Sequence, residues 1–279
     1  MIDRSSTSEV SRVPLFTVNS ERSAMTSKLT FHKRAFMLAA LCLSSLAAAP
    51  AFAGDVQVAV AANFTEPAKE IAAAFEAKTG NHVVMSFGPS GGFYSQIQQG
   101  APFEVFLSAD AERPTKLEAE GQGVNGSRFV YAYGTLVLWS ATPSFVDGKG
   151  AVLKKGNFQH IAIADPAAAP YGMAAVETMK KLGLYDTLAP KIVKGSSIAQ
   201  AYGFVDTGSA ELGFVALSQV FKLNKGSRWV VPAADYTPID QQAILLNPGA
   251  NDPAARAYIA FLKSPEAVKI IKSYGYAVH

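Results

Sequence analysis

Cysteine is almost absent from this chain of 279 residues, since the only one is Cys42. It lies in an apolar N-terminal segment that we expect to be removed, so the remaining chain would carry no thiol. Disulfides, cysteine-ligated metals and cysteine nucleophiles are then excluded. The residue before Cys42 is Leu41, whereas a lipid-modified cysteine follows a small residue, so we expect no lipid anchor.

Histidine is also scarce, with His82, His160 and His279 as the three that follow residue 53. No two of them form the i, i+4 pair typical of a metal site on a helix, so we expect no bare metal cation. Asp110 ends a strand-like run and is a carboxylate that could coordinate a cation. The favoured interpretation is that it caps the helix that follows.

An excess of one charge sign is missing as well. The net charge is +3, but residues 1–53 hold six of the 25 basic residues and three of the 22 acidic ones, which leaves 19 of each. After residue 53, basic residues are adjacent only at Lys154-Lys155 and Lys180-Lys181. Without a stripe of basic side chains, nucleic acid is not an expected partner.

The N-terminal segment has the composition of a secretory signal peptide. A basic region at 28–34 precedes an apolar run of 12 residues at 35–46, which is too short to span a bilayer permanently. Ala51-Phe52-Ala53 is a small-x-small cleavage signal, so we expect export and cleavage after Ala53. Residues 1–24 are polar and without pattern, which favours Met25 as the true start.

From Gly54 onward, short apolar runs alternate with helical patterns, which predicts an α/β fold with mostly parallel sheets flanked by helices. The alternation of strand and helix patterns changes near Tyr133 and again near Ala234, as expected for two lobes connected by two crossovers. We expect a ligand cleft between the lobes. The predicted lobes are residues 54–133 with 233–279, and residues 134–232. The predicted strands are Val56 to Ala61, His82 to Phe87, Val105 to Ala109, Thr135 to Trp139, Ile161 to Ala164, Leu212 to Leu217, Trp229 to Val231 and Ala243 to Leu246.

The turn at Phe87–Gly92 places Ser90 among glycines, between a strand pattern and a helix pattern that begins at Tyr94. The spacing Gly88-x-Ser90-x-Gly92 is that of a nucleophile elbow, in which an exposed serine attacks an acyl carbon. It equally suits an anion cradle, where free N–H groups at a helix N-terminus bind an oxyanion. A plain glycine-rich turn before a helix is the third interpretation.

A serine hydrolase would need a histidine to activate Ser90. His82 begins the strand that ends near Ser90, roughly 17 Å away in an extended chain, while His160 begins another strand and His279 is the last residue. None is well placed, so a secreted hydrolase with Ser90 as nucleophile is a minor alternative. We expect no enzymatic activity.

The anion cradle predicts several donor-rich turns that face one cleft. Besides the turn at Ser90, such turns occur at Ala62-Asn63, Pro170-Tyr171-Gly172 and Ser197-Ile198, each before a helix. None contains Lys or Arg, so a bound anion would be held by dipoles and hydrogen bonds alone. Taken singly, Asn63 could be a plain cap, Tyr171 an exposed aromatic and Ile198 a core residue.

Together these residues resemble the periplasmic molybdate-binding proteins of molybdate ABC transporters. The similar runs cover essentially the whole chain after the signal peptide. They are VAVAANF at 58–64, SFGPSGGFYSQIQQGAPFEVFLSAD at 86–110, ADPAAAPYGMAA at 164–175, KLGLYDTLAPKIV at 181–193 and ELGFVALSQV at 211–220.

The resemblance implies a two-lobed type II periplasmic binding protein that closes around molybdate or tungstate, without a cofactor. By position, the implied ligand contacts are Asn63 and Ser90 in the first lobe and Tyr171 and the backbone N–H of Ile198 in the second. Many relatives have a tyrosine where this chain has Ala216, so we hypothesise that Tyr171 supplies the missing hydroxyl. The implied partner is a membrane permease, and we expect a monomer. Another tetrahedral oxyanion, such as sulfate, is the alternative ligand.

The predicted processing can be tested by N-terminal sequencing of the exported protein. We expect the sequence to begin at Gly54, since the small-x-small signal ends at Ala53. A product that retains residues 28–46 would contradict the prediction of a cleaved signal peptide.

Overall fold

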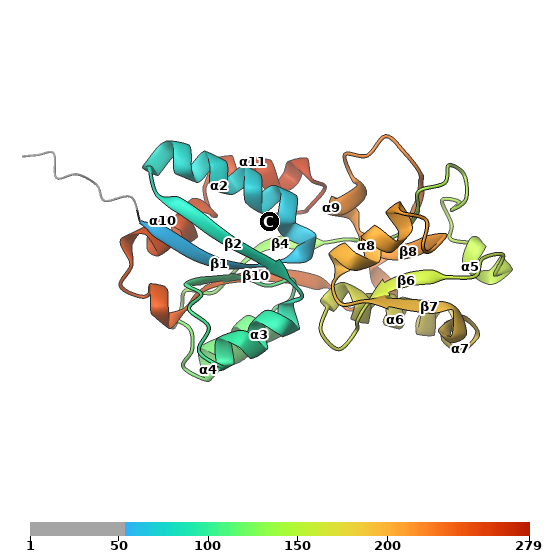
Figure 1. Ribbon diagram of the computed structural model, residues 1–279, viewed down its shortest axis with the longest axis horizontal. Helices are drawn as coiled ribbons and strands as arrows, with labels where there is room; N and C mark the ends of the chain where they lie inside the picture. Colours follow the sequence, from blue (N-terminus) through green and yellow to red (C-terminus); the bar gives the residue numbers. More distant parts are fainter. Residues whose placement is uncertain (1–53) are drawn as a thin grey trace, which may run out of the picture. The chain divides into compact units, whose positions relative to one another are not determined.

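Two five-stranded sheets, each flanked by helices, form the part of the chain that the computed structural model describes, residues 54–279 (Figure 1). The predicted signal peptide and its cleavage site lie outside these residues. We call the sheet with strand order β2-β1-β3-β10-β4 and its helices the first lobe, and the sheet with order β7-β6-β8-β5-β9 and its helices the second lobe.

The first lobe contains strands β1 (Asp55–Ala61), β2 (His82–Gly88), β3 (Val105–Leu107), β4 (Phe129–Gly134) and β10 (Ile239–Leu245), and helices η2 (Ala62–Phe64), α2 (Thr65–Thr79), α3 (Ser90–Gln98), α4 (Glu112–Ala119), η5 (Asn247–Gly249), α10 (Pro253–Phe261) and α11 (Pro265–Ser273). The second lobe contains strands β5 (Leu136–Ser140), β6 (Ile161–Ala164), β7 (Ile192–Gly195), β8 (Leu212–Ala216) and β9 (Ser227–Val230), and helices α5 (Val152–Lys155), α6 (Pro170–Lys181), α7 (Tyr185–Leu188), η3 (Ala189–Lys191), α8 (Ile198–Asp206) and α9 (Leu217–Val220). The short helix η4 (Ala233–Asp235) lies on the return crossover.

Both sheets belong to the predicted two-lobed α/β architecture, and each contains parallel and antiparallel strand pairs. Strand β1 pairs in parallel with β2 and β3, and β6 pairs in parallel with β7 and β8, but β10 and β5 are antiparallel to their neighbours. The reason is the double crossover between the lobes. Strands β5 and β10 each begin where the chain has just crossed, so they run away from the cleft while their neighbours run toward it.

The core of each lobe forms where the apolar faces of its helices and sheet meet. Helix α2 buries Ala68, Ile71, Ala72 and Phe75, which lie on one face because they recur at helical spacing. The ring of Phe75 packs edge-on against Tyr258 of α10, with centroids 5.2 Å apart. Within residues 54–279, no helix is both long enough and apolar enough to cross a membrane.

Two strands and one helix boundary differ from the sequence prediction. Strands β4 and β7 were not expected, because β4 does not alternate cleanly between buried and exposed residues and β7 is a short strand at the sheet edge. Helix α3 begins at Ser90, four residues before the predicted start at Tyr94. Gly91 and Gly92 are poor helix formers, but the N–H of Gly91 donates to the carbonyl of Ala168 at 2.9 Å, a tertiary contact that the sequence does not reveal.

The division into two lobes that each move as one body stays a prediction. The predicted lobes are residues 54–133 with 233–279, and residues 134–232. The strands of each sheet fall within these ranges except for Gly134, the last residue of β4. The two connections between the lobes are therefore short, at Thr135 and at residues 231–238.

Gly172 tests how tightly α6 packs on its own lobe. A Cβ at this position would collide with the backbone carbonyl of Ala164, which cannot move without disturbing β6. We expect Gly172→Ala to lower the free energy of unfolding by about 1–3 kcal/mol, measured by urea denaturation.

Gly203→Ala in α8 is the matched control, because a Cβ there meets no atom within 4 Å. Alanine is the better helix former, so this variant should gain about 0.5–1 kcal/mol. Equal stability of the two variants would contradict the close packing of Gly172.

Candidate functional site: a donor-lined pocket between the lobes

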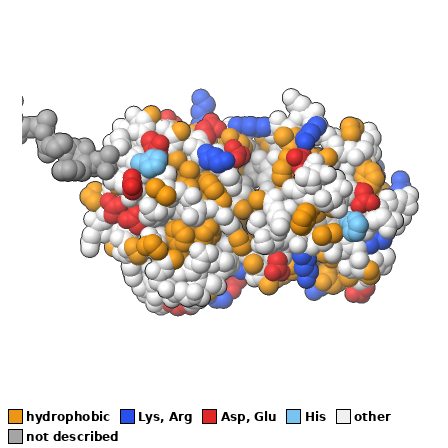
Figure 2. All heavy atoms as spheres, viewed as in Figure 1, with side chains coloured by type: hydrophobic (Ala, Val, Ile, Leu, Met, Phe, Trp, Pro, Cys, Tyr) orange, Lys and Arg blue, Asp and Glu red, His pale blue; other side chains and the backbone are white. Residues whose placement is uncertain are grey.

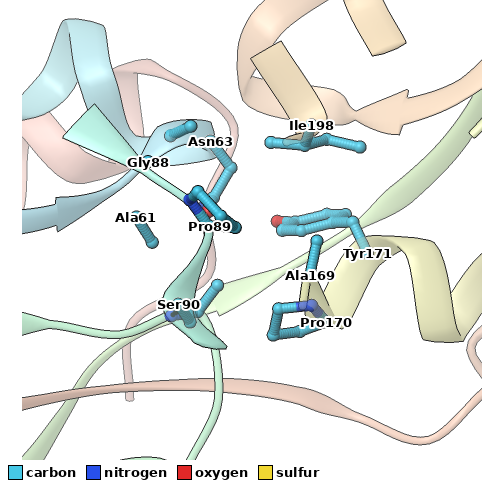
Figure 3. A pocket seen from close by; sticks show the side chains of 11 residues that line it. Ala61, Asn63, Gly88, Pro89, Ser90, Ala169, Pro170, Tyr171 and Ile198 are labelled. Atoms are coloured by element: carbon cyan, nitrogen blue, oxygen red, sulfur yellow. Dashed lines mark hydrogen bonds between the residues drawn. The ribbon is translucent and has the colours of Figure 1, made fainter. Parts of the chain in front are cut away.

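Four predicted site residues, Asn63, Ser90, Tyr171 and Ile198, line one small pocket between the lobes (Figure 3). The pocket has a cavity volume of only about 10 Å³, far below the ~300–1,000 Å³ of pockets that bind drug-sized ligands. Its lining residues are Ala61, Ala62, Asn63, Gly88, Pro89, Ser90, Ala109, Ala169, Pro170, Tyr171 and Ile198. The structure thus brings together residues that are up to 135 positions apart in the sequence. Whether they bind a ligand stays a prediction.

Each of these four residues is the first or second residue of a helix. Asn63 is the second residue of η2, Ser90 the first of α3, Tyr171 the second of α6 and Ile198 the first of α8. The N–H groups of a first helical turn have no acceptor within their own helix. Four such groups, with the positive ends of their helices, therefore surround the pocket.

The local sequence explains why these helices begin at the pocket. Pro89 holds an extended backbone immediately before α3, and Pro170 occupies the first position of α6, where its missing N–H costs nothing. Before α8, the Ser197 side chain accepts a hydrogen bond from the N–H of Gln200 and caps the helix.

Ser90 is almost completely buried, with 1% of its surface exposed. Its Oγ accepts a hydrogen bond from the N–H of Ala109 at 2.9 Å. Because that contact uses an oxygen lone pair, the hydroxyl hydrogen remains available to a group in the pocket. No histidine in the described part of the chain is hydrogen-bonded to Ser90, and Nδ1 of His82 instead lies 2.7 Å from Glu76.

The side-chain amide of Asn63 is bonded to other residues of the protein. The Nδ2 of Asn63 donates to Oε1 of Gln241 at 2.8 Å and to the hydroxyl of Tyr276 at 2.9 Å. Both amide hydrogens are therefore used inside the protein. The backbone N–H of Asn63 is the donor that it can offer to a ligand.

Tyr171 is buried, and its hydroxyl points across the pocket toward the first lobe in Figure 3. The hydroxyl oxygen accepts a hydrogen bond from Nε2 of Gln241 at 3.3 Å. Burial raises the pKa of Tyr171 well above its usual range, with a further increase from the neighbouring Tyr276. The hydroxyl therefore stays protonated and can donate.

Ile198 can offer only its backbone N–H, because its side chain is apolar. The α9 turn is connected to this position through Gln219, whose Nε2 donates to the carbonyl of Ile198 at 3.1 Å and whose Oε1 accepts from the N–H of Ala216 at 3.0 Å. Ala216 itself is fully buried and is not among the residues that line the pocket.

The lining contains no charged side chain, neither a Lys or Arg to neutralise an anion nor an Asp or Glu to accept a proton. On the molecular face shown in Figure 2, side chains of both signs are interspersed, without a region of one sign. Residues 54–279 contain no group of three or more His, Cys, Asp or Glu side chains that could hold a metal ion. The pocket can therefore hold a small anion through hydrogen bonds and helix dipoles.

Asp110 lies at the rim of the pocket rather than inside it. Its Oδ1 accepts a hydrogen bond from the N–H of Arg113 at 2.9 Å, in the first turn of α4, and its Oδ2 pairs with the Arg113 guanidinium. This contact agrees with the predicted capping role. Next to it, the N–H of Gly91 donates to Ala168 of the second lobe, so the two lobes are in contact at this rim.

Sequence reasoning missed a group of buried polar residues behind the pocket. Their hydroxyl and amide groups form hydrogen bonds to Asn63 and Tyr171, either directly or through one another. They lie far apart in the sequence and belong to no motif, so only the tertiary structure reveals them. They are Tyr131, Ser218, Gln241 and Tyr276.

Comparison with known proteins agrees with this geometry. Residues 56–277 match the family described as bacterial extracellular solute-binding protein. The molybdate-binding protein ModA of Rhodobacter capsulatus is 62% identical over 237 residues, which cover 85% of this chain and 94% of that protein. The ModA protein of Azotobacter vinelandii is 59% identical over 238 residues, with 84% of this chain and 94% of that protein covered.

Solved structures show the same fold. The periplasmic molybdate-binding protein of Azotobacter vinelandii superposes with a TM-score of 0.78 and 43% sequence identity, covering 80% of this chain and 99% of that chain. The sulfate-binding protein SubI of Mycobacterium tuberculosis has a TM-score of 0.67 but only 14% identity over 80% of this chain and 86% of that chain, so it shares the fold alone. This chain therefore belongs to the bacterial extracellular solute-binding protein family and, within it, to the molybdate-binding proteins.

Proposed function

We propose that this protein captures molybdate, or tungstate, in the pocket between its lobes and delivers it to the permease of an ABC transporter. The observation that carries the proposal is the convergence of four helix N-termini on a pocket without charged side chains. The names of its relatives support this ligand in particular. On this proposal the protein is a monomer in the periplasm, exported with cleavage after Ala53, and performs no catalysis.

The proposed donors are sufficient in strength. Four backbone N–H groups and the hydroxyls of Ser90 and Tyr171 give six hydrogen bonds to the oxyanion, each worth about 1.5–3 kcal/mol when the acceptor is charged. Association itself costs part of this sum. Since micromolar affinity requires only about 8 kcal/mol, dipoles and hydrogen bonds can bind the ion without a cationic side chain.

Capture requires the two lobes to close on the ion. Asn63 and Ser90 belong to the first lobe, Tyr171 and Ile198 to the second, so neither lobe alone surrounds the pocket. We expect the lobes to separate at the two short connections and to close when donors from both halves reach the same oxyanion. The contact between Gly91 and Ala168 belongs to the closed form.

The chemistry of the lining predicts selection for fully deprotonated oxyanions. No carboxylate lines the pocket, so a ligand that carries a proton, such as hydrogen phosphate, finds no charged acceptor for it. Sulfate has the charge and shape of molybdate but a smaller radius, and it remains the alternative ligand. The structural likeness to a sulfate-binding protein concerns the fold alone and does not favour it.

A serine hydrolase is the alternative of a different class. The environment of Ser90 argues against a hydrolase. Its Oγ accepts a hydrogen bond from the N–H of Ala109, and no histidine among residues 54–279 is hydrogen-bonded to it. Without a general base, the hydroxyl is a donor and a poor nucleophile.

Thermal unfolding in the presence of oxyanions tests the proposed ligand. At one hundred times its dissociation constant, a ligand adds about 2.7 kcal/mol of stability, which for a chain of this size raises Tm by roughly 5–11 °C. We expect this shift with molybdate and tungstate, and a shift of less than about 2 °C with phosphate at the same concentration.

Sulfate in the same experiment separates the two candidate ions. A larger shift with sulfate than with molybdate would replace the proposed ligand. No shift with any oxyanion, together with ester hydrolysis that is lost in Ser90→Ala, would instead favour the hydrolase.

Tyr171→Phe tests whether this hydroxyl binds the ion. The substitution keeps the ring and removes one charge-assisted hydrogen bond, so we expect the affinity for molybdate, measured by calorimetry, to fall by about 1.5–3 kcal/mol. A change below about 0.5 kcal/mol would contradict the hypothesis that Tyr171 supplies the hydroxyl that Ala216 lacks. Tyr185→Phe is the matched control, because Tyr185 begins α7 and does not line the pocket.

A further inference from the structure

Behind the pocket, a chain of hydrogen bonds connects buried side chains of both lobes. Its members lie on different elements, and none of them carries a formal charge. Tyr131 lies on β4, Gln241 on β10 and Tyr276 in the C-terminal segment after α11, while Tyr171 and Ser218 come from the second lobe. Each hydroxyl has one hydrogen and each amide has a donor end and an acceptor end, so the direction of every bond limits the next one.

The chain of bonds starts at the backbone carbonyl of Asn63, a group that can only accept. The Ser218 hydroxyl donates to it at 2.9 Å, and the Tyr276 hydroxyl has two acceptors for its hydrogen, this carbonyl and Oγ of Ser218, each at 2.9 Å. The single hydrogen of Tyr276 is then used, so its oxygen is left to accept. It accepts from Nδ2 of Asn63, also at 2.9 Å, which fixes the donor end of that amide toward Tyr276.

The orientation of Asn63 determines that of Gln241. The second Nδ2 hydrogen of Asn63 requires an acceptor, and Oε1 of Gln241 lies 2.8 Å away. The hydroxyl of Tyr131 has two acceptors for its hydrogen, the same oxygen at 3.1 Å and the carbonyl of Ser108 at 3.2 Å. Tyr131 reaches Oε1 of Gln241 because the pairing of β4 with β10 shifts between Gln241 and Gln242, and such irregularities redirect side chains.

With its oxygen held in this way, Gln241 presents its nitrogen to Tyr171. Nε2 lies 3.3 Å from the Tyr171 hydroxyl and donates to its oxygen. The only hydrogen of that hydroxyl is therefore not used on Gln241. The oxygen of Tyr276 is a neighbouring neutral acceptor for it, but a charged oxyanion in the pocket is the stronger acceptor.

We infer that Gln241 is a positioning residue that directs the Tyr171 hydroxyl hydrogen into the pocket, although Gln241 does not itself line it. The inference rests on the proposed function, because the hydrogen needs an oxyanion to receive it. Gln241 is fully buried and belongs to the first lobe, whereas Tyr171 belongs to the second. The hydroxyl is therefore oriented as a donor only when the lobes are closed.

A double-mutant cycle on molybdate affinity tests this role. Gln241→Met removes both the donor and the acceptor at similar volume, and we expect the dissociation constant to rise about 3–10-fold. In the Tyr171→Phe background the hydroxyl is already gone, so the same substitution should change the dissociation constant by less than about 2-fold. A residue that merely stabilised the lobe would weaken binding equally in both backgrounds.

Gln242→Met is the matched control on the same strand. Oε1 of Gln242 accepts from Nη1 of Arg128 at 2.9 Å, and its side chain is not part of the chain of bonds behind the pocket. We expect its affinity to stay within about 2-fold of the wild type. If Gln241→Met does not fold, Tyr131→Phe replaces it in the cycle, because it removes one donor to Oε1 of Gln241 and keeps the ring packed on Phe64.

The outcomes separate this inference from the proposed function. Unchanged or tighter binding by Gln241→Met, or an equal loss with and without the Tyr171 hydroxyl, would overturn the role of Gln241 while molybdate binding stands. A Tyr171→Phe variant that binds as tightly as the wild type would also overturn it. Failure of the wild-type protein to bind any oxyanion would overturn the proposed function and the inference with it.

Discussion

The structure around the pocket depends on a simple constraint: the first N–H groups of a helix have no partner within that helix. Such groups are stable only where water, a side chain or a ligand accepts their hydrogens. Four helices of this protein begin at one pocket, two from each lobe, and the pocket has no carboxylate or cationic side chain. On the proposed function, an anion of suitable size would satisfy all four helix ends at once, and its recognition would need no counter-charge.

The buried polar residues behind the pocket fix the direction in which each hydroxyl donates its hydrogen. A backbone N–H points where the helix places it, but a hydroxyl can rotate and can either donate or accept. In this protein the ambiguity is removed by neighbours whose own orientations are fixed, beginning with the carbonyl of Asn63. Burial also keeps these hydroxyls protonated, since it raises the pKa of Tyr276 to about 12. These hydroxyls can therefore all act as hydrogen-bond donors.

The same arrangement connects binding to the closing of the lobes. The Tyr276 hydroxyl lies 2.9 Å from Oγ of Ser218, and Gln241 bonds to Tyr171, so both contacts join the first lobe to the second. Opening the lobes would leave these buried polar groups without their partners or expose them to water. On the proposed function, the ion and this network would therefore both stabilise the closed arrangement of the lobes.

The sequence by itself determined the alternation of elements, the helix start at Ile198 and four of the residues that line the pocket, because glycine, proline and capping residues act locally. It did not determine strands β4 and β7, the mixed sheets or the extension of α3 back to Ser90, which depend on contacts such as that between Gly91 and Ala168. Nor did it reveal Gln241, since hydrogen-bond direction is set by neighbours that only the tertiary structure brings together. The internal hydrogen bonds of the Asn63 amide, which leave the backbone N–H as its available donor, were decided in the same way.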